Sequence, residues 1–163
     1  MRALPLVLAA AAASGCLSPD KPLFNEMDTT RPSILQIEPP LGDLYGGDGG
    51  VPSFSGGVIF TVHFSEPMDV SSLRPGIAVR DMNKVEQPLD LYVAPAYLAA
   101  PLTQADLDVD WPVEVSSPSG FVPGVYQLIL RELLIDAQGN PLQVPAADGG
   151  FSDNGYVATF QVM

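Results

Sequence analysis

Short stretches in which every second residue is apolar recur along this chain and constrain its fold. In 58–65, Phe60, Val62 and Phe64 would share one face of a strand, and His63 would point away from them. The 15 Gly and 17 Pro residues suit short strands joined by turns rather than long helices. We therefore expect an all-β protein, an antiparallel β-sandwich of about seven strands. The predicted strands are 33–38, 58–65, 77–80, 88–93, 111–116, 125–130 and 156–162.

Two longer stretches between these strands carry no clear period. The first, 41–57, reads as a glycine-rich loop, and the second, 94–110, as a loop or a short helix. No internal repeat is visible, so we expect one sandwich domain over 32–163, a length that suits a single core.

The N-terminus reads as an export signal. Arg2 precedes an apolar, alanine-rich run too short to span a bilayer as a helix, and the run ends in Ser14, Gly15 and Cys16. This end, with Ala13 before it, resembles the lipobox of bacterial lipoproteins, in which the cysteine is lipidated and the chain is cut before it. The resemblance implies a signal peptide over 1–15 and fatty acyl chains such as palmitate on Cys16, the one cysteine of the chain. An ordinary signal peptide with a coincidental cysteine is the alternative.

The segment that follows Cys16 is polar and interrupted by Pro19 and Pro22. We interpret 16–31 as the lipidated cysteine and a disordered, flexible linker. The expected location is the bacterial cell envelope, with the protein anchored to a membrane by lipid. Leu17, after the cysteine, favours the outer membrane by the rule that holds for enterobacterial lipoproteins.

The charge balance argues against a nucleic-acid partner. Seven Lys and Arg residues face 19 Asp and Glu residues, a net charge of −12. Removal of 1–15 takes away Arg2 and no acid, so the processed chain would carry 6 − 19 = −13. Such a chain repels phosphates, which leaves the membrane, reached through the lipid anchor, and an envelope protein or glycan as expected partners.

Three blocks in the predicted domain resemble the SbsA-type bacterial Ig-like domain, a module of bacterial surface proteins. They lie at 62–69 (VHFSEPMD), 123–126 (PGVY) and 136–140 (DAQGN), and the resemblance extends over about 31–163. It implies an Ig-like sandwich with a structural or interaction role and no catalysis. The motif residues matched are Phe64, Pro67, Met68, Asp69, Tyr126, Asp136, Gly139 and Asn140.

The chemistry of these motif residues suggests structural roles. Phe64 and Met68 would enter the core, and Asp69 could cap a helical turn over 70–73 or accept bonds in a turn. Tyr126 could bury its ring and bond the backbone through its hydroxyl, as in a tyrosine corner. Gly139 and Asn140 would supply the positive-φ residues of a tight turn.

Catalytic and transition-metal sites lack the residues they need. His63 is the only histidine and no G-x-S-x-G elbow is present, so we expect neither an enzyme nor a cofactor.

Two other binding chemistries stay open. Asp106, Asp108 and Asp110 could converge on calcium if 94–110 is a loop, although they do not fit an EF-hand. Tyr92, Tyr97 and Trp111 could form an aromatic platform for sugar, but Trp111 better fits a core position. The alternative function is therefore a loop-based module that binds calcium or glycan.

Overall fold

The structure is a computed structural model that describes residues 29–41, 50–98, 110–145, 151–152 and 155–163. The predicted signal peptide, Cys16 and the linker as far as residue 28 lie outside the described residues. In the described part, no helix is long and apolar enough to cross a membrane.

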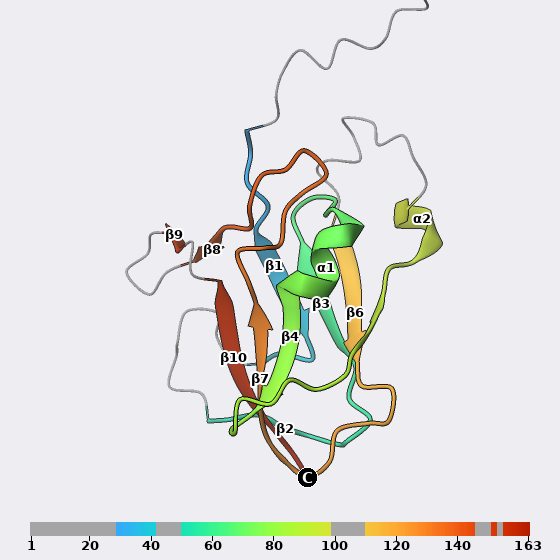
Figure 1. Cartoon of the computed structure of the whole chain (residues 1–163), viewed down its shortest axis with the longest axis vertical. Coiled ribbons are helices and arrows are strands. Elements are labelled where there is room, and N and C mark those ends of the chain that lie inside the picture. Colours follow the sequence, from blue (N-terminus) through green and yellow to red (C-terminus); the bar gives the residue numbers. More distant parts are fainter. Residues whose placement is uncertain (1–28, 42–49, 99–109, 146–150, 153–154) are drawn as a thin grey trace, which may run out of the picture.

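Two four-stranded sheets lie face to face and form an all-β sandwich (Figure 1). The first sheet has the order β1-β3-β6-β5 and the second the order β2-β10-β7-β4. The strands of the first sheet are β1 (Ile34–Glu38), β3 (Phe60–Phe64), β6 (Trp111–Ser116) and β5 (Asp90–Tyr92). Those of the second are β2 (Ser53–Phe54), β10 (Tyr156–Val162), β7 (Gly124–Leu130) and β4 (Ile77–Asp81). Every pairing within these sheets is antiparallel except the parallel pair of β10 with β2.

The expected all-β sandwich is confirmed, and each of the seven predicted strands corresponds to a strand of the structure. The prediction did not include β2, nor the small separate pair formed by β8 (Val144–Pro145) and β9 (Phe151–Ser152). Each of the three is two residues long, too short for an alternating pattern to stand out. The prediction of a loop throughout 41–57 was wrong at β2, because hydrogen bonding to β10 draws this piece into the second sheet.

Two short helices complete the described fold. α1 (Val70–Gly76) carries the chain from β3 in the first sheet to β4 in the second. α2 (Pro95–Leu98) occupies the start of the stretch that the sequence left open between loop and helix.

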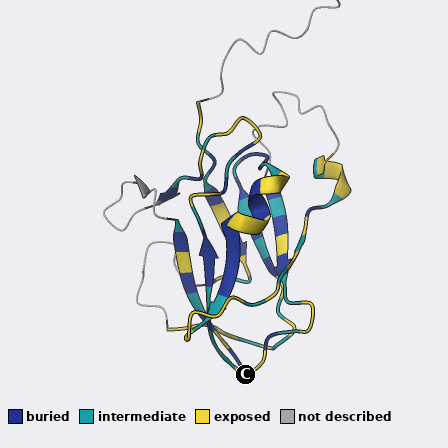
Figure 2. Cartoon of the chain, viewed as in Figure 1, coloured by how far each residue is buried: buried dark blue, intermediate teal, exposed yellow. Residues whose placement is uncertain are grey.

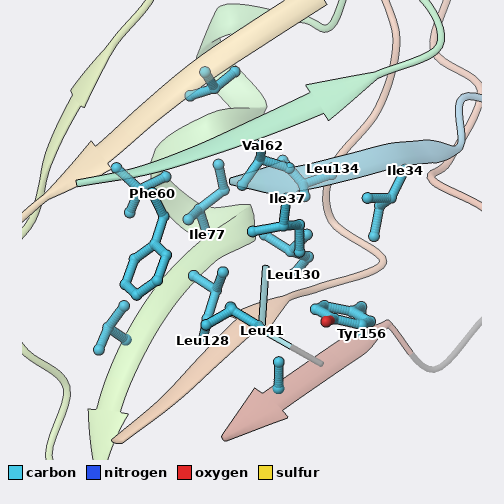
Figure 3. Close-up of a cluster of buried hydrophobic side chains, with 14 of the residues drawn as sticks. Ile34, Ile37, Leu41, Phe60, Val62, Ile77, Leu128, Leu130, Leu134 and Tyr156 are labelled. Atoms are coloured by element: carbon cyan, nitrogen blue, oxygen red, sulfur yellow. The ribbon is translucent and has the colours of Figure 1, made fainter. Parts of the chain in front are cut away.

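The core lies between the sheets and follows the predicted alternation. β3 and β10 bury every second residue, and Figure 2 shows this banding along the strands. Side chains from both sheets meet in Figure 3, where Phe60 and Val62 of β3 lie over Leu128 and Leu130 of β7. The rings of Phe60 and Phe160 approach to 4.8 Å between centroids across the two sheets. Burial of one such side chain stabilises the fold by about 1.5 to 3 kcal/mol.

Candidate functional site

The segment before β1 is bonded to residues 141–143 at one end of the sandwich. The Arg31 Nε–H donates to the carbonyl of Pro141 (3.2 Å), and the Gln143 N–H donates to the carbonyl of Pro32 (2.7 Å). Ser33 continues this contact as an isolated parallel bridge to Gln143. The segment that leads back toward Cys16 therefore leaves the domain beside 141–143.

The first motif block ends in a helix cap. The Asp69 carboxylate accepts bonds from the Ser71 N–H (2.8 Å) and the Ser71 hydroxyl (2.9 Å) at the start of α1. Before it, Phe64, Pro67 and Met68 are buried. The predicted capping role of Asp69 and the predicted core positions of Phe64 and Met68 are confirmed.

The third block is a turn built around a buried carboxylate. Asp136 is only 1% exposed, and its Oδ1 accepts the N–H groups of Gln138 (2.8 Å) and Asn140 (2.7 Å). Its Oδ2 accepts the side-chain amide of Asn140 (2.8 Å). Gly139 has a positive φ of 94°, as predicted. The prediction of a positive φ at Asn140 was wrong, because this residue contributes hydrogen bonds to the turn instead of a left-handed backbone.

The first and third blocks pair with each other in space. Met68 and Asp136 form an antiparallel bridge, and the Asp69 N–H donates to the carbonyl of Ile135 (2.9 Å). The Ala137 N–H donates to the carbonyl of Pro67 (3.1 Å) on the other side of this bridge. Because these contacts span almost 70 positions, no local pattern in the sequence could have revealed them.

The second block forms the predicted tyrosine corner. The Tyr126 ring is buried and stacks on Phe160, with 5.6 Å between centroids and 24° between planes. Its hydroxyl donates to the carbonyl of Val122 (2.9 Å).

The only histidine lies against an aspartate of the calcium candidate. Strand pairing sets His63 opposite Pro112, and the His63 Nδ1 lies 2.8 Å from the carboxylate of Asp110. The His63 side chain is 17% exposed and its Nε2 is buried without a hydrogen bond in the described structure. His63 thus points away from the core, as predicted, but is more covered than a solvent-facing side chain.

The calcium candidate is only partly visible. Asp106 and Asp108 lie outside the described residues, so the structure places Asp110 alone. Within the described ranges, no group of three or more His, Cys, Asp or Glu residues is arranged to hold a metal ion.

The three aromatic residues of the predicted sugar-binding platform do not share one exposed surface. Trp111 is 2% exposed and belongs to the core, where its Nε1–H reaches the carbonyl of Tyr97 at 3.5 Å. Tyr97 is half-buried against the same core. Tyr92 alone keeps an exposed ring, and the proposed platform of three rings does not form.

Tyr92 lines an open groove of about 340 Å³ that the sequence did not indicate. α1 supplies Val70, Leu73 and Arg74 to this groove, and α2 supplies Leu98. The volume lies at the small end of the range for ligand pockets. A helix turn, a strand edge and a second short helix meet here only through the tertiary fold, so the sequence carried no signal for it.

Comparisons with known proteins return no family model that matches the chain and no matching curated protein. Three solved structures of the bacterial S-layer protein SbsC match its fold distantly: the N-terminal part, rSbsC(31-844) and domains 1-6. Their identities are 13%, 12% and 12%, with TM-scores of 0.38, 0.38 and 0.39. They cover 82%, 81% and 82% of this chain, which spans 24%, 14% and 14% of theirs. This likeness is too distant to carry a function.

Proposed function

We propose that this chain is a lipid-anchored protein of the bacterial cell envelope whose Ig-like module has a structural or interaction role and no catalytic activity. The observation that carries the proposal is the use of the motif side chains. Asp69, Tyr126 and Asp136 each bond the backbone of their own turn or helix end, so the residues that resemble the SbsA-type domain stabilise the fold. A module built in this way presents surfaces rather than reactive groups.

Lipid on Cys16 would attach the module at one defined end. The chain meets the domain at Arg31 and Ser33, which bond the 141–143 segment. The fifteen or so residues between Cys16 and this junction could extend about 50 Å. With acyl chains contributing about 0.8 kcal/mol per buried methylene, the anchor would hold the domain near the membrane durably.

Cell fractionation with palmitate labelling tests the anchor. The parent should take up labelled palmitate and sediment with membranes, whereas Cys16→Ser should be unlabelled and either soluble or uncleaved. The double variant Cys16→Ser/Ser18→Cys is the matched control, because it restores one thiol two positions outside the lipobox. A Cys16→Ser protein that is processed and still sediments with membranes would contradict the proposal.

Crosslinking in intact envelopes, followed by pull-down, tests the interaction role. Recovery of one protein or polymer in stoichiometric amount from the parent, and its loss when Cys16→Ser releases the module, would support an anchored interaction module. Recovery of no partner would leave a spacer or coat role.

The second candidate is a binding module for calcium or glycan. The half-exposed ring of Tyr92 in the groove favours a sugar, since an exposed aromatic face is a stacking surface. Calcium would have to compete with His63 for Asp110. A bound ligand raises the melting temperature by mass action, so millimolar calcium and a glycan array test the two versions separately. No thermal shift with calcium would eliminate the first, and no glycan signal the second.

A further inference from the structure

The groove beside α1 combines an apolar lining with one unpaired cation. Arg74 lies in the last turn of α1 and is exposed. Among the described residues that line the groove, it is the only charged one. Arg74 makes no hydrogen bond or ion pair with the described part of the chain, in contrast to Arg131, which pairs with Glu86. A guanidinium left open in this way offers donors that fit a carboxylate, sulfonate or phosphate.

The apolar lining comes from three separate elements. Val70 of α1 is 51% exposed, Tyr92 of β5 is 53% exposed and Leu98 of α2 is 49% exposed, and all three line the groove. Leu73 and Val93 form its buried floor. Half-exposed apolar side chains that converge in one hollow gain free energy when an apolar body covers them.

The charge of the groove differs from that of the chain as a whole. The sequence carries a net charge of −12, yet no acidic side chain of the described residues lines this hollow. Two acids adjoin the groove without lining it, Asp69 beside Ser71 and Glu114 opposite Tyr92, so among the described residues Arg74 is the charge in the groove itself.

We propose that this groove binds a free small anion with an apolar or aromatic body, its acidic group on Arg74 and its body against Val70, Tyr92 and Leu98. The site is distinct from the lipid anchor and does not depend on it. An open groove of this size would hold one ring system or a short hydrocarbon chain, with a dissociation constant on the order of 0.1 mM.

Fluorescence titration of the full chain carrying Cys16→Ser tests the proposal with two matched probes. Anilinonaphthalenesulfonate supplies an aromatic body with a sulfonate, and N-phenylnaphthylamine supplies the same body without charge. The sulfonate should bind about tenfold more tightly than the neutral probe, because a charged hydrogen bond stabilises it. Octanoate should displace the sulfonate probe, and octanol should not at the same concentration.

Two pairs of variants locate the binding. Arg74→Gln should weaken binding of the sulfonate probe about tenfold, whereas Lys84→Gln, which removes an exposed cation elsewhere, should leave it unchanged. Leu98→Ala should weaken binding of both probes, whereas Leu133→Ala removes a similarly exposed leucine outside the groove and should weaken neither. Equal effects of Arg74→Gln and Lys84→Gln would overturn the proposal, as would equal affinity for both probes. Binding to phosphatidylglycerol vesicles without binding to the free anions would replace it with a membrane surface.

Discussion

The hydroxyl of Tyr126 donates a 2.9 Å hydrogen bond to the carbonyl oxygen of Val122, four residues earlier in the chain. This bond closes the segment that leads into β7, while the ring contacts both Phe121 and Phe160 in the core. One side chain therefore fixes both the start of a central strand and the packing beneath it.

Tyr126→Phe should lower the free energy of unfolding by about 1 kcal/mol, because it removes this bond and keeps the ring contacts. Urea denaturation measures the change. Tyr92→Phe removes the hydroxyl of a ring that is 53% exposed and should have little effect. Equal stability of Tyr126→Phe and the parent would show that the corner bond makes no net contribution.

Removal of the Asp136 carboxylate should be more costly. Asp136→Ala leaves the N–H groups of Gln138 and Asn140 without their acceptor in a part-buried turn, which should cost about 3 kcal/mol. Asp136→Asn keeps one oxygen for those two donors but loses the bond from the Asn140 amide, so its cost should be smaller. An Asn variant less stable than the Ala variant in the same urea titration would contradict this account.

Gly76, at the end of α1, should tolerate no larger residue. An added Cβ would collide with the side chain of Leu134, which is fully buried. Alanine gains up to about 1 kcal/mol in helix propensity, but overpacking costs about 1 to 3 kcal/mol. Gly76→Ala should therefore lower the melting temperature, whereas Gly57→Ala, with no atom within 4 Å of the new Cβ, should not. A stabilised Gly76→Ala protein would mean that Leu134 moves aside freely.

Tyr156 should make the fold sensitive to alkali. Desolvation by burial raises the pKa of Tyr156 from 10.0 to about 12. The folded state favours the neutral phenol more strongly than the unfolded chain does. The stability that depends on this neutral phenol is therefore fully present below pH 10 and is lost as the pH rises to 12. The loss should reach at most about 2 to 3 kcal/mol.

Unfolding free energies of the parent and Tyr156→Phe, compared at pH 9 to 12, measure this contribution. The two curves should diverge above pH 10, with the parent losing more stability than the variant. Parallel curves across this range would show that the phenol of Tyr156 titrates alike in the folded and unfolded chain.

The strands were predictable because alternation is a local property. Phe60, Val62 and Phe64 show their shared face within five residues of sequence, and β3 buries all three. β2 was not predictable, since Ser53 and Phe54 become a strand only through pairing with Gln161 and Val162. The same limit applies to His63 and Asp110, which the register of β3 and β6 brings together from positions 47 apart.

The candidate sites divide in the same way. The sequence indicated that Asp69 would cap a helical turn and that Tyr126 would bond the backbone, because both interactions lie within a few residues. The predicted positive φ at Asn140 was wrong. The N–H of Asn140 bonds the carboxylate of Asp136 from an ordinary backbone conformation instead. The sequence also favoured a core position for Trp111 over a place in a sugar platform, and the burial of Trp111 confirms that position.

The sequence alone therefore determined the seven strands of three or more residues, the turn at 136–140, and that the chain is acidic with a single cysteine at Cys16. Each of these follows from side-chain chemistry over a few neighbouring residues. Only the tertiary structure decided that the segments around Met68 and Asp136 pair with each other, and that Arg74, Tyr92 and Leu98 line one groove. Those relationships depend on how two sheets pack on a common core, and that packing is set by the whole set of buried side chains rather than by any local pattern.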